Sequence, residues 1–133
     1  MLKHVIADDI APPFGNYSHA VEIPPGARVL QLAGQVGCRP DGSVPEGAEA
    51  QAEIIFANIE RVLAKAGMEL SDLVKLNVFV VSREDLPAIR AARNRLIGKP
   101  APALSLVLVA GLGQESWRLE VDGLAARLET SGS

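Results

Sequence analysis

The sequence predicts an α+β fold in which two helices pack on one face of a mixed β-sheet. Two segments, 47–66 and 82–97, repeat apolar residues every three or four positions, as amphipathic helices do. Short apolar segments rich in β-branched residues precede, separate and follow them. The resulting order is β-β-β-α-β-α-β-β, and two helices are too few to cover both faces of a sheet of five or six strands.

The elements before the first helix are predicted to be strands. A short strand is expected at 3–7, and strands at 17–23 and 28–34 flank the turn Pro24-Pro25-Gly26. Residues 35–46 are rich in glycine, proline and aspartate, so we expect a loop there. The N-terminal third of the chain is therefore expected to contribute strands and connections only.

The middle of the chain is predicted to form helix, strand and helix. Gly67 follows the first helical segment and is expected to cap its C-terminus. Residues 74–81 alternate in polarity and are rich in β-branched residues, so they are expected to form a strand. The second helix is expected to start at Ser82, because residues 82–85 match a capping box, and to end near Ile97.

Two further strands are expected at 104–109 and 117–128, and the Gly111-x-Gly113 segment between them is expected to form a tight hairpin. Alternate side chains along 104–109 point to opposite faces, and both sets are mostly apolar. The face without helices therefore needs a cover, which identical subunits would supply. The sequence predicts one domain over 1–133 that forms an oligomer, with a frayed tail at 129–133.

Composition limits the classes of function. The chain has 133 residues, of which 48% are hydrophobic, enough for one domain with its own core. Its net charge of −3 and the lack of a basic cluster argue against nucleic acid as a partner. The longest apolar stretch falls well short of the roughly 20 residues that cross a bilayer. Residues 1–13 contain Asp8 and Asp9 and no long apolar run, so they do not resemble a secretion signal, and we expect a soluble, cytoplasmic protein with no membrane partner.

Several kinds of site are not expected. His4, His19 and Cys38 are scattered and lack the spacing of metal ligands, so neither a metal nor another cofactor is predicted. His19 is interpreted as a structural or surface histidine and Cys38 as a loop thiol. The single cysteine also excludes an internal disulfide, which fits a reducing compartment.

Three separated blocks carry a family resemblance. They read Gly15-Asn16-Tyr17-Ser18-His19-Ala20-Val21, then Ala33-Gly34-Gln35-Val36, and finally Pro102-Ala103-Leu104-Ser105 leading into Leu119-Glu120-Val121-Asp122. In this order and at this chain length, the sequence resembles the YjgF/RidA (Rid) family. The resemblance implies a RidA fold of the chorismate mutase-like type. It also implies a homotrimer with a central β-barrel and a small-molecule ligand in the clefts between subunits.

The resemblance also assigns site residues. Tyr17 corresponds to a pocket tyrosine, Gly34 to a glycine whose backbone lines the site, and Asp122 to a glutamate that positions the attacking water. Active imine deaminases of the family carry a Pro-Ala-Arg-Ser segment, whose arginine grips the substrate carboxylate. This chain has Leu104 at that position. A leucine offers no hydrogen-bond donor, so a carboxylate beside it would be desolvated and unpaired.

Alternative interpretations stay open for these residues. Tyr17 could instead be an interface aromatic whose hydroxyl is bonded. Asp122 would equally suit the polar face of a strand that also carries Arg118 and Glu120.

Another arginine could take the place of the missing one. Projected at 100° per residue, Arg93 falls in the middle of the apolar stripe of the second helix, with Arg90 at its edge. In one interpretation these side chains snorkel, or pair with Asp122 or Glu120 at a subunit interface. In the other, one of them reaches the pocket and supplies its positive charge.

Three functions follow from these patterns. The first is a Rid-type trimer that binds a small metabolite in its clefts, with ordinary 2-imino acid deaminase activity weak or absent. The second is a metal-free imine or enamine deaminase, or a related hydrolase, with a shifted substrate anchored by Arg90 or Arg93. The third, an endoribonuclease or translation inhibitor, is disfavoured by the acidic balance of the chain and by the lack of paired histidines.

Overall fold

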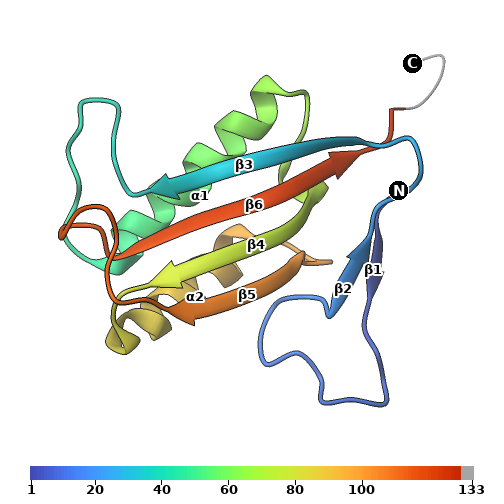
Figure 1. Cartoon of the computed structure of the whole chain (residues 1–133), viewed down its shortest axis with the longest axis horizontal. Helices are drawn as coiled ribbons and strands as arrows, with labels where there is room; N and C mark the ends of the chain where they lie inside the picture. Colours follow the sequence, from blue (N-terminus) through green and yellow to red (C-terminus); the bar gives the residue numbers. More distant parts are fainter. Residues whose placement is uncertain (130–133) are drawn as a thin grey trace.

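Four strands form the main sheet of the structure, a computed structural model that describes residues 1–129 (Figure 1). They lie in the order β3 (Arg28–Val36), β6 (Leu119–Arg127), β4 (Leu73–Val80) and β5 (Ala103–Leu108). Only β4 and β5 run parallel to each other, while β6 is antiparallel to both of its neighbours. The sheet is therefore mixed, as the sequence predicts.

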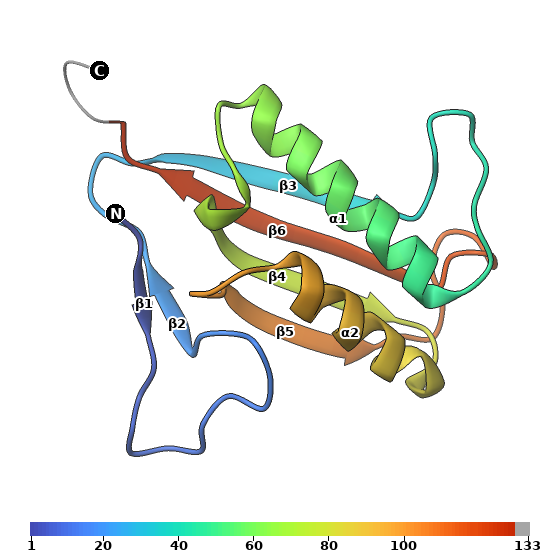
Figure 2. The same ribbon diagram turned by 180° about the vertical axis from the view of Figure 1, so that it is seen from behind.

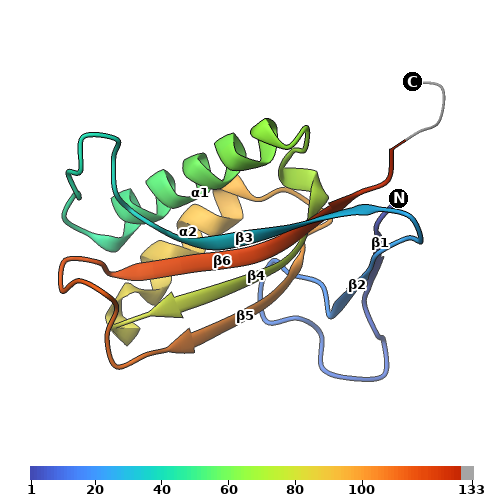
Figure 3. The same cartoon turned by 45° about the horizontal axis from the view of Figure 1, so that its top comes forward.

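Both helices, α1 (Ala48–Lys65) and α2 (Leu86–Leu96), lie on one face of this sheet (Figures 2 and 3). Their apolar stripes meet the inward side chains of the strands, and the core between them is fully closed to solvent. Its centre is formed by Ile55, Ile59, Leu63, Leu76, Val80, Leu119 and Val121. The α+β class and the two helices on one face are confirmed.

The C-terminus of α1 is capped as predicted. Gly67 adopts φ +71°, a conformation that a side chain disfavours. The Gly67 N–H donates to the carbonyl oxygen of Ala64 at 3.1 Å, and the Met68 N–H donates to that of Leu63 at 2.8 Å. This pair of bonds is a Schellman motif, which satisfies the last carbonyl groups of the helix.

The start of α2 differs from the prediction. Ser82 makes no side-chain capping bond, and residues Arg83–Asp85 form a 3₁₀ turn. The α-helix begins only at Leu86, with a proline at its first positions. Pro87 explains the difference, because its ring fixes φ for the first helical turn and it has no N–H for a capping side chain to bind.

The first two strands do not extend the main sheet. β1 (Lys3–Val5) and β2 (Ala20–Glu22) pair with each other, and a single bridge between Ser18 and Ala103 connects this hairpin to β5 (Figure 1). Both strands are shorter than predicted, and the expected sheet of five or six strands is wrong. The length and polarity of segments 3–7 and 17–23 do not indicate that these two strands pair only with each other.

The predicted hairpin at Gly111-x-Gly113 is also wrong. β5 and β6 are not neighbours, because β4 lies between them. The chain from β5 to β6 must therefore pass the end of β4 before it enters the sheet in the opposite direction. The glycines belong to this crossing connection and not to a two-strand turn.

The sheet face away from the helices stays uncovered in a single chain, and we call it the open face. It carries Lys75, Asn77 and Phe79 of β4, which alternate with buried residues. Apolar side chains lie on it as well, including Val29, which is 55% exposed, and Val107, which is 47% exposed. None of the helices described within residues 1–129 is long and apolar enough to cross a membrane.

The predicted frayed tail falls mostly outside the described part of the chain. Glu129 is described, and it accepts a hydrogen bond from Nε of Arg28 at 2.7 Å. Residues 130–133 lie outside the described residues.

Candidate functional site

Leu104 lies on the edge strand β5 and faces α2. Its side chain packs against the core and also lines a cavity of about 180 Å³. We call this cavity the arginine pocket; its walls are Phe14, Gly15, Tyr17, Arg90, Arg93, Leu104 and Leu106. The structure thus brings together four of the residues that the sequence singled out, from three separate segments. A leucine and two arginines share the space where the family resemblance leads one to expect a single arginine.

Arg93 is the most unusual residue of the arginine pocket. Its side chain is only 4% exposed, and its buried Nε has no hydrogen-bond partner. Burial lowers the pKa of the Arg93 guanidinium, and the positive charge of Arg90 adds to this effect, while Tyr17 opposes it. Within residues 1–129, neither Arg90 nor Arg93 forms a salt bridge, whereas Arg95 on the same helix binds Glu53 at 2.6 Å. The pocket therefore contains positive charge without an anion.

A short loop, residues 14–18, forms one wall of the arginine pocket. The Tyr17 hydroxyl accepts a hydrogen bond from the Phe14 N–H at 3.0 Å, and the Tyr17 N–H donates to the Gly15 carbonyl at 3.0 Å. Nδ2 of Asn16 donates to the carbonyl oxygen of Ile97 at 3.0 Å, which ties the loop to the end of α2. The Tyr17 hydroxyl still has its own proton to donate.

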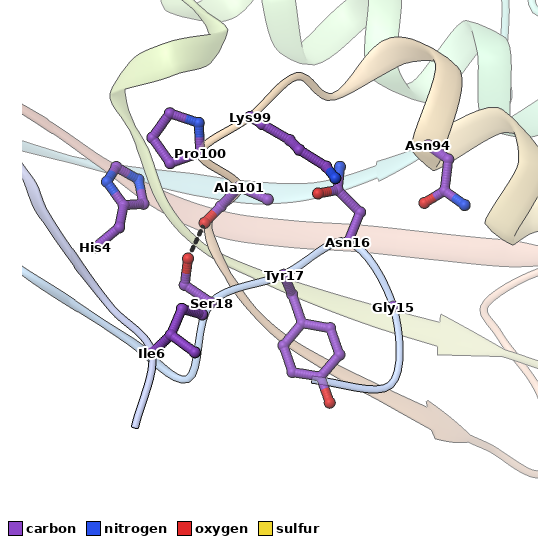
Figure 4. Close-up of a pocket in the computed structure, with 10 residues that line it drawn as sticks. All are labelled: His4, Ile6, Gly15, Asn16, Tyr17, Ser18, Asn94, Lys99, Pro100 and Ala101. Atoms are coloured by element: carbon purple, nitrogen blue, oxygen red, sulfur yellow. Dashed lines mark hydrogen bonds between the residues drawn. The ribbon is translucent and has the colours of Figure 1, made fainter. Parts of the chain in front are cut away.

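A second and larger cavity, of about 700 Å³, lies on the other side of this loop (Figure 4). Its lining includes His4, Asn16, Asn94, Lys99 and Pro100. Gly15 and Tyr17 line both cavities, and Figure 4 shows the Tyr17 ring pointing away from Lys99 and Asn94. The bond from Oγ of Ser18 to the Ala101 carbonyl, at 2.6 Å, holds the loop against the start of β5.

Asp122 and Gly34 do not line the arginine pocket. On β6, Glu120 and Asp122 alternate with the buried Leu119 and Val121, so both carboxylates point to the open face. Leu104 packs on the helix side of the sheet, and β4 separates β5 from β6. Within a single chain, the carboxylate of Asp122 therefore lies away from Arg90 and Arg93.

The two open-face carboxylates have different surroundings. Asp122 accepts a hydrogen bond from Nδ2 of Asn77, its neighbour on β4, at 2.7 Å. The Glu120 carboxylate lies over Gly34, where an added Cβ would come 2.8 Å from its Cδ. Gly34, which the resemblance places in the site, thus lies beside Glu120. The sequence could not distinguish the two acids because they share one face of the same strand.

Sequence reasoning missed Phe14, Gly15 and Leu106 as lining residues. Leu106 could have been found, because it follows Leu104 by two residues and so points to the same side of β5. The loop residues carry no such signal, since their position depends on contacts with α2.

His19 has the structural role that was predicted for it. Nδ1 accepts a hydrogen bond from the Ala7 N–H at 3.0 Å, and Nε2 lies 3.0 Å from the Ala11 carbonyl oxygen. These bonds hold the segment before the loop. Among residues 1–129 no group of three or more His, Cys, Asp or Glu residues is arranged to hold a metal ion.

Known proteins share this architecture and 29–33% of the aligned residues. The chain is 33% identical to a protein of Dermatophagoides farinae named 2-iminobutanoate/2-iminopropanoate deaminase, over 92% of this chain and 94% of the relative. A solved Rid protein of unknown function, YyfB from Yersinia pestis, superposes with a TM-score of 0.84 at 31% identity, covering 95% of this chain and 98% of that one. RidA from an Antarctic Psychrobacter superposes with a TM-score of 0.70 at 29% identity, over 92% and 98% of the two chains. A family model described as endoribonuclease L-PSP matches residues 9–127. The chain therefore belongs to the YjgF/RidA family.

Proposed function

We propose that this protein binds a small carboxylate-bearing metabolite in the arginine pocket and hydrolyses ordinary 2-imino acids weakly or not at all. One observation carries the proposal: Arg93, whose buried Nε has no hydrogen-bond partner, lines a cavity whose wall includes Leu104. A buried cation is costly unless an anion and hydrogen bonds compensate it. A bound carboxylate supplies both, because it accepts two parallel hydrogen bonds from one guanidinium.

Weak activity on ordinary 2-imino acids follows from the position of the arginine that binds the substrate carboxylate. Position 104 offers no donor, and the guanidinium comes from α2 on the opposite wall of the pocket. A carboxylate held by Arg93 therefore places the imine carbon differently from one held at position 104. Misplacement of about 1 Å costs roughly 100-fold in rate for a well-oriented reaction.

The oligomer is part of the proposal. The open face carries exposed apolar residues, and further copies of the chain packed against it would remove that area from water. A homotrimer with ligand clefts between subunits would also let a carboxylate of one copy approach the arginine pocket of another. Within one chain Glu120 and Asp122 have no access to that pocket.

A second candidate is an imine or enamine deaminase with a shifted substrate. The 33% identity to a relative named as a deaminase favours it, and so does the pair of arginines in the pocket. In this reaction water adds to the carbon of the C=N bond, the nitrogen takes up protons, and ammonia leaves as the carbonyl forms. Arg93 or Arg90 would hold the substrate carboxylate, and Asp122 or Glu120 of another copy would accept a proton from the water.

The family model is described by a ribonuclease activity, which we do not propose for this chain. Its net charge is −3, and sequence-independent RNA binding depends on clustered lysine and arginine. We expect no RNA binding at any salt concentration.

Calorimetric titration with 2-oxobutanoate, a stable 2-oxo acid, tests the proposed function. The wild-type protein should bind it, and Arg93→Met should weaken binding at least tenfold. Arg95→Met is the matched control, because Arg95 lies on the same helix but pairs with Glu53 on the outer surface. In parallel, the protein should accelerate hydrolysis of 2-iminobutanoate over buffer weakly or not at all. Rapid hydrolysis would establish the deaminase instead, and loss of binding in both variants would remove Arg93 as the anchor.

A further inference from the structure

Two arginines line the arginine pocket, although one would suffice to hold one carboxylate. We infer that the pocket selects a short dicarboxylate over a monocarboxylate of the same length, with Arg93 binding one carboxylate and Arg90 the other. This inference rests on the proposed function, because it names the ligand class of the same site. It makes Arg90 the residue that sets specificity.

Arg90 and Arg93 give the pocket more than one unit of positive charge that no acid compensates within residues 1–129. Arg90 and Arg93 form no salt bridge within residues 1–129, and the nearby acids on and around α2 have other partners. Glu84 and Asp85 pair with Arg118, while Glu49 and Glu53 pair with Arg95. A monocarboxylate would leave one guanidinium uncompensated beside the other, whereas two carboxylates neutralise both.

The spacing of the arginines favours two separate anionic groups. Residues three apart on a helix have Cβ atoms about 5–6 Å from each other and lie on one face. Arg93 is buried, whereas Arg90 is exposed. One carboxylate would therefore be held deep in the pocket and the other at its rim. A single compact anion such as phosphate would leave one of these two positions unoccupied.

The walls between the arginines are suited to a hydrocarbon link. Leu104 and Leu106 of β5 face the two guanidinium groups across the pocket. The volume of about 180 Å³ corresponds to roughly six waters, so the link must be short. The Tyr17 hydroxyl is the one neutral polar side chain among the lining residues, and its proton is free to bond a carboxylate oxygen.

The competing occupant is an acid of a second copy. Glu120 and Asp122 are on the open face, and an oligomer that inserts either of them would neutralise the arginines without any ligand. The two cases differ in a measurable way. A ligand site binds dicarboxylates in the unmodified protein, whereas a site filled by a partner's acid binds them only after that acid is removed.

Calorimetric titration of the unmodified oligomer with matched acids tests the inference. Succinate is compared with butanoate, glutarate with pentanoate, and inorganic phosphate is a separate arm. We expect each dicarboxylate to bind at least tenfold more tightly than its monocarboxylate. Arg90→Gln should bring this ratio close to one, and Arg95→Gln, which removes the same charge from the outer side of α2, should leave the ratio unchanged.

Each other result would count against the inference. Equal affinity for succinate and butanoate would overturn dicarboxylate selection but leave the proposed carboxylate site intact. Tighter binding of phosphate than of either dicarboxylate would do the same. Absence of binding by every acid would overturn both the inference and the proposed function. Binding that appears only after Glu120→Gln or Asp122→Asn would assign the pocket to a second copy.

Discussion

The guanidinium of Arg93 lies against Gly15, so that a Cβ added at position 15 would come 2.9 Å from Nη2. The loop that carries Tyr17 therefore packs directly on a cation that comes from α2. Two bonds from this loop, one from Asn16 to Ile97 and one from Ser18 to Ala101, hold it in place. The position of the anchor and the shape of the loop depend on each other.

Gly15→Ala should weaken carboxylate binding by about tenfold, or roughly 1.4 kcal/mol. The added methyl group cannot be accommodated without moving either the loop or the Arg93 guanidinium. Calorimetric titration with 2-oxobutanoate measures the effect. Gly98→Ala is the control, because nothing lies within 4 Å of a Cβ at that position. Equal affinities of the two variants would show that the loop is not held against Arg93.

Arg93→Met should increase the free energy of unfolding by roughly 1–4 kcal/mol while it abolishes ligand binding. The substitution replaces an uncompensated buried charge with an apolar side chain of similar length. Chemical denaturation at one fixed protein concentration measures this, because the stability of an oligomer depends on concentration. A large loss of stability would mean instead that Arg93 is paired with an acid from another copy.

Leu104→Arg should destabilise the protein by about 1–3 kcal/mol, because it adds a third guanidinium beside Arg90 and Arg93. In the Arg93→Met background, Leu104→Arg should reduce the free energy of unfolding by at least 1 kcal/mol less than it does in the wild type. The reason is that substitutions at neighbouring charged positions do not have additive effects. The double variant should also hydrolyse 2-iminobutanoate at least tenfold faster than Arg93→Met alone, as measured by ammonia release. Additive stability changes and unchanged hydrolysis would show that positions 93 and 104 do not share an anchor site.

Two glycines of the sheet should respond differently to alanine. At Gly123 a Cβ would collide with the carbonyl oxygen of Lys75, which the β4–β6 pairing fixes in place. At Gly34 it would meet only the end of the Glu120 side chain, which can turn aside. Gly123→Ala should therefore cost roughly 1–3 kcal/mol of unfolding free energy and Gly34→Ala less than about 1 kcal/mol. Thermal denaturation of the two variants tests this order, and a reversed order would contradict the β4–β6 register.

Much of the fold could be predicted because its signals are local. The apolar repeat of α1 and the glycine at position 67 specify a helix and its end without reference to the rest of the chain. The buried position of Arg93 and the exposed edge position of Arg90 also followed from helical spacing alone. Pairing between distant strands has no comparable local signal, which is why the β1–β2 hairpin and the crossing from β5 to β6 were not foreseen.

The candidate site was predictable only in part, for the same reason. Tyr17, Arg90, Arg93 and Leu104 were identified one by one, but their meeting in one cavity depends on how α2 packs against β5. Asp122 was grouped with them although strand alternation turns it to the other face of the sheet. Gly34 lies beside Glu120 because of an irregularity in the β3–β6 register after Leu32, which the sequence does not indicate.

A crystal structure of the protein grown in the presence of 2-oxobutanoate would test most directly whether Arg93 is a ligand anchor. We predict that the carboxylate of the bound acid lies within hydrogen-bonding distance of the Arg93 guanidinium, with Leu104 against its carbon chain. An Arg93 side chain bonded instead to Glu120 or Asp122 of a second copy, with no acid in the pocket, would contradict this assignment.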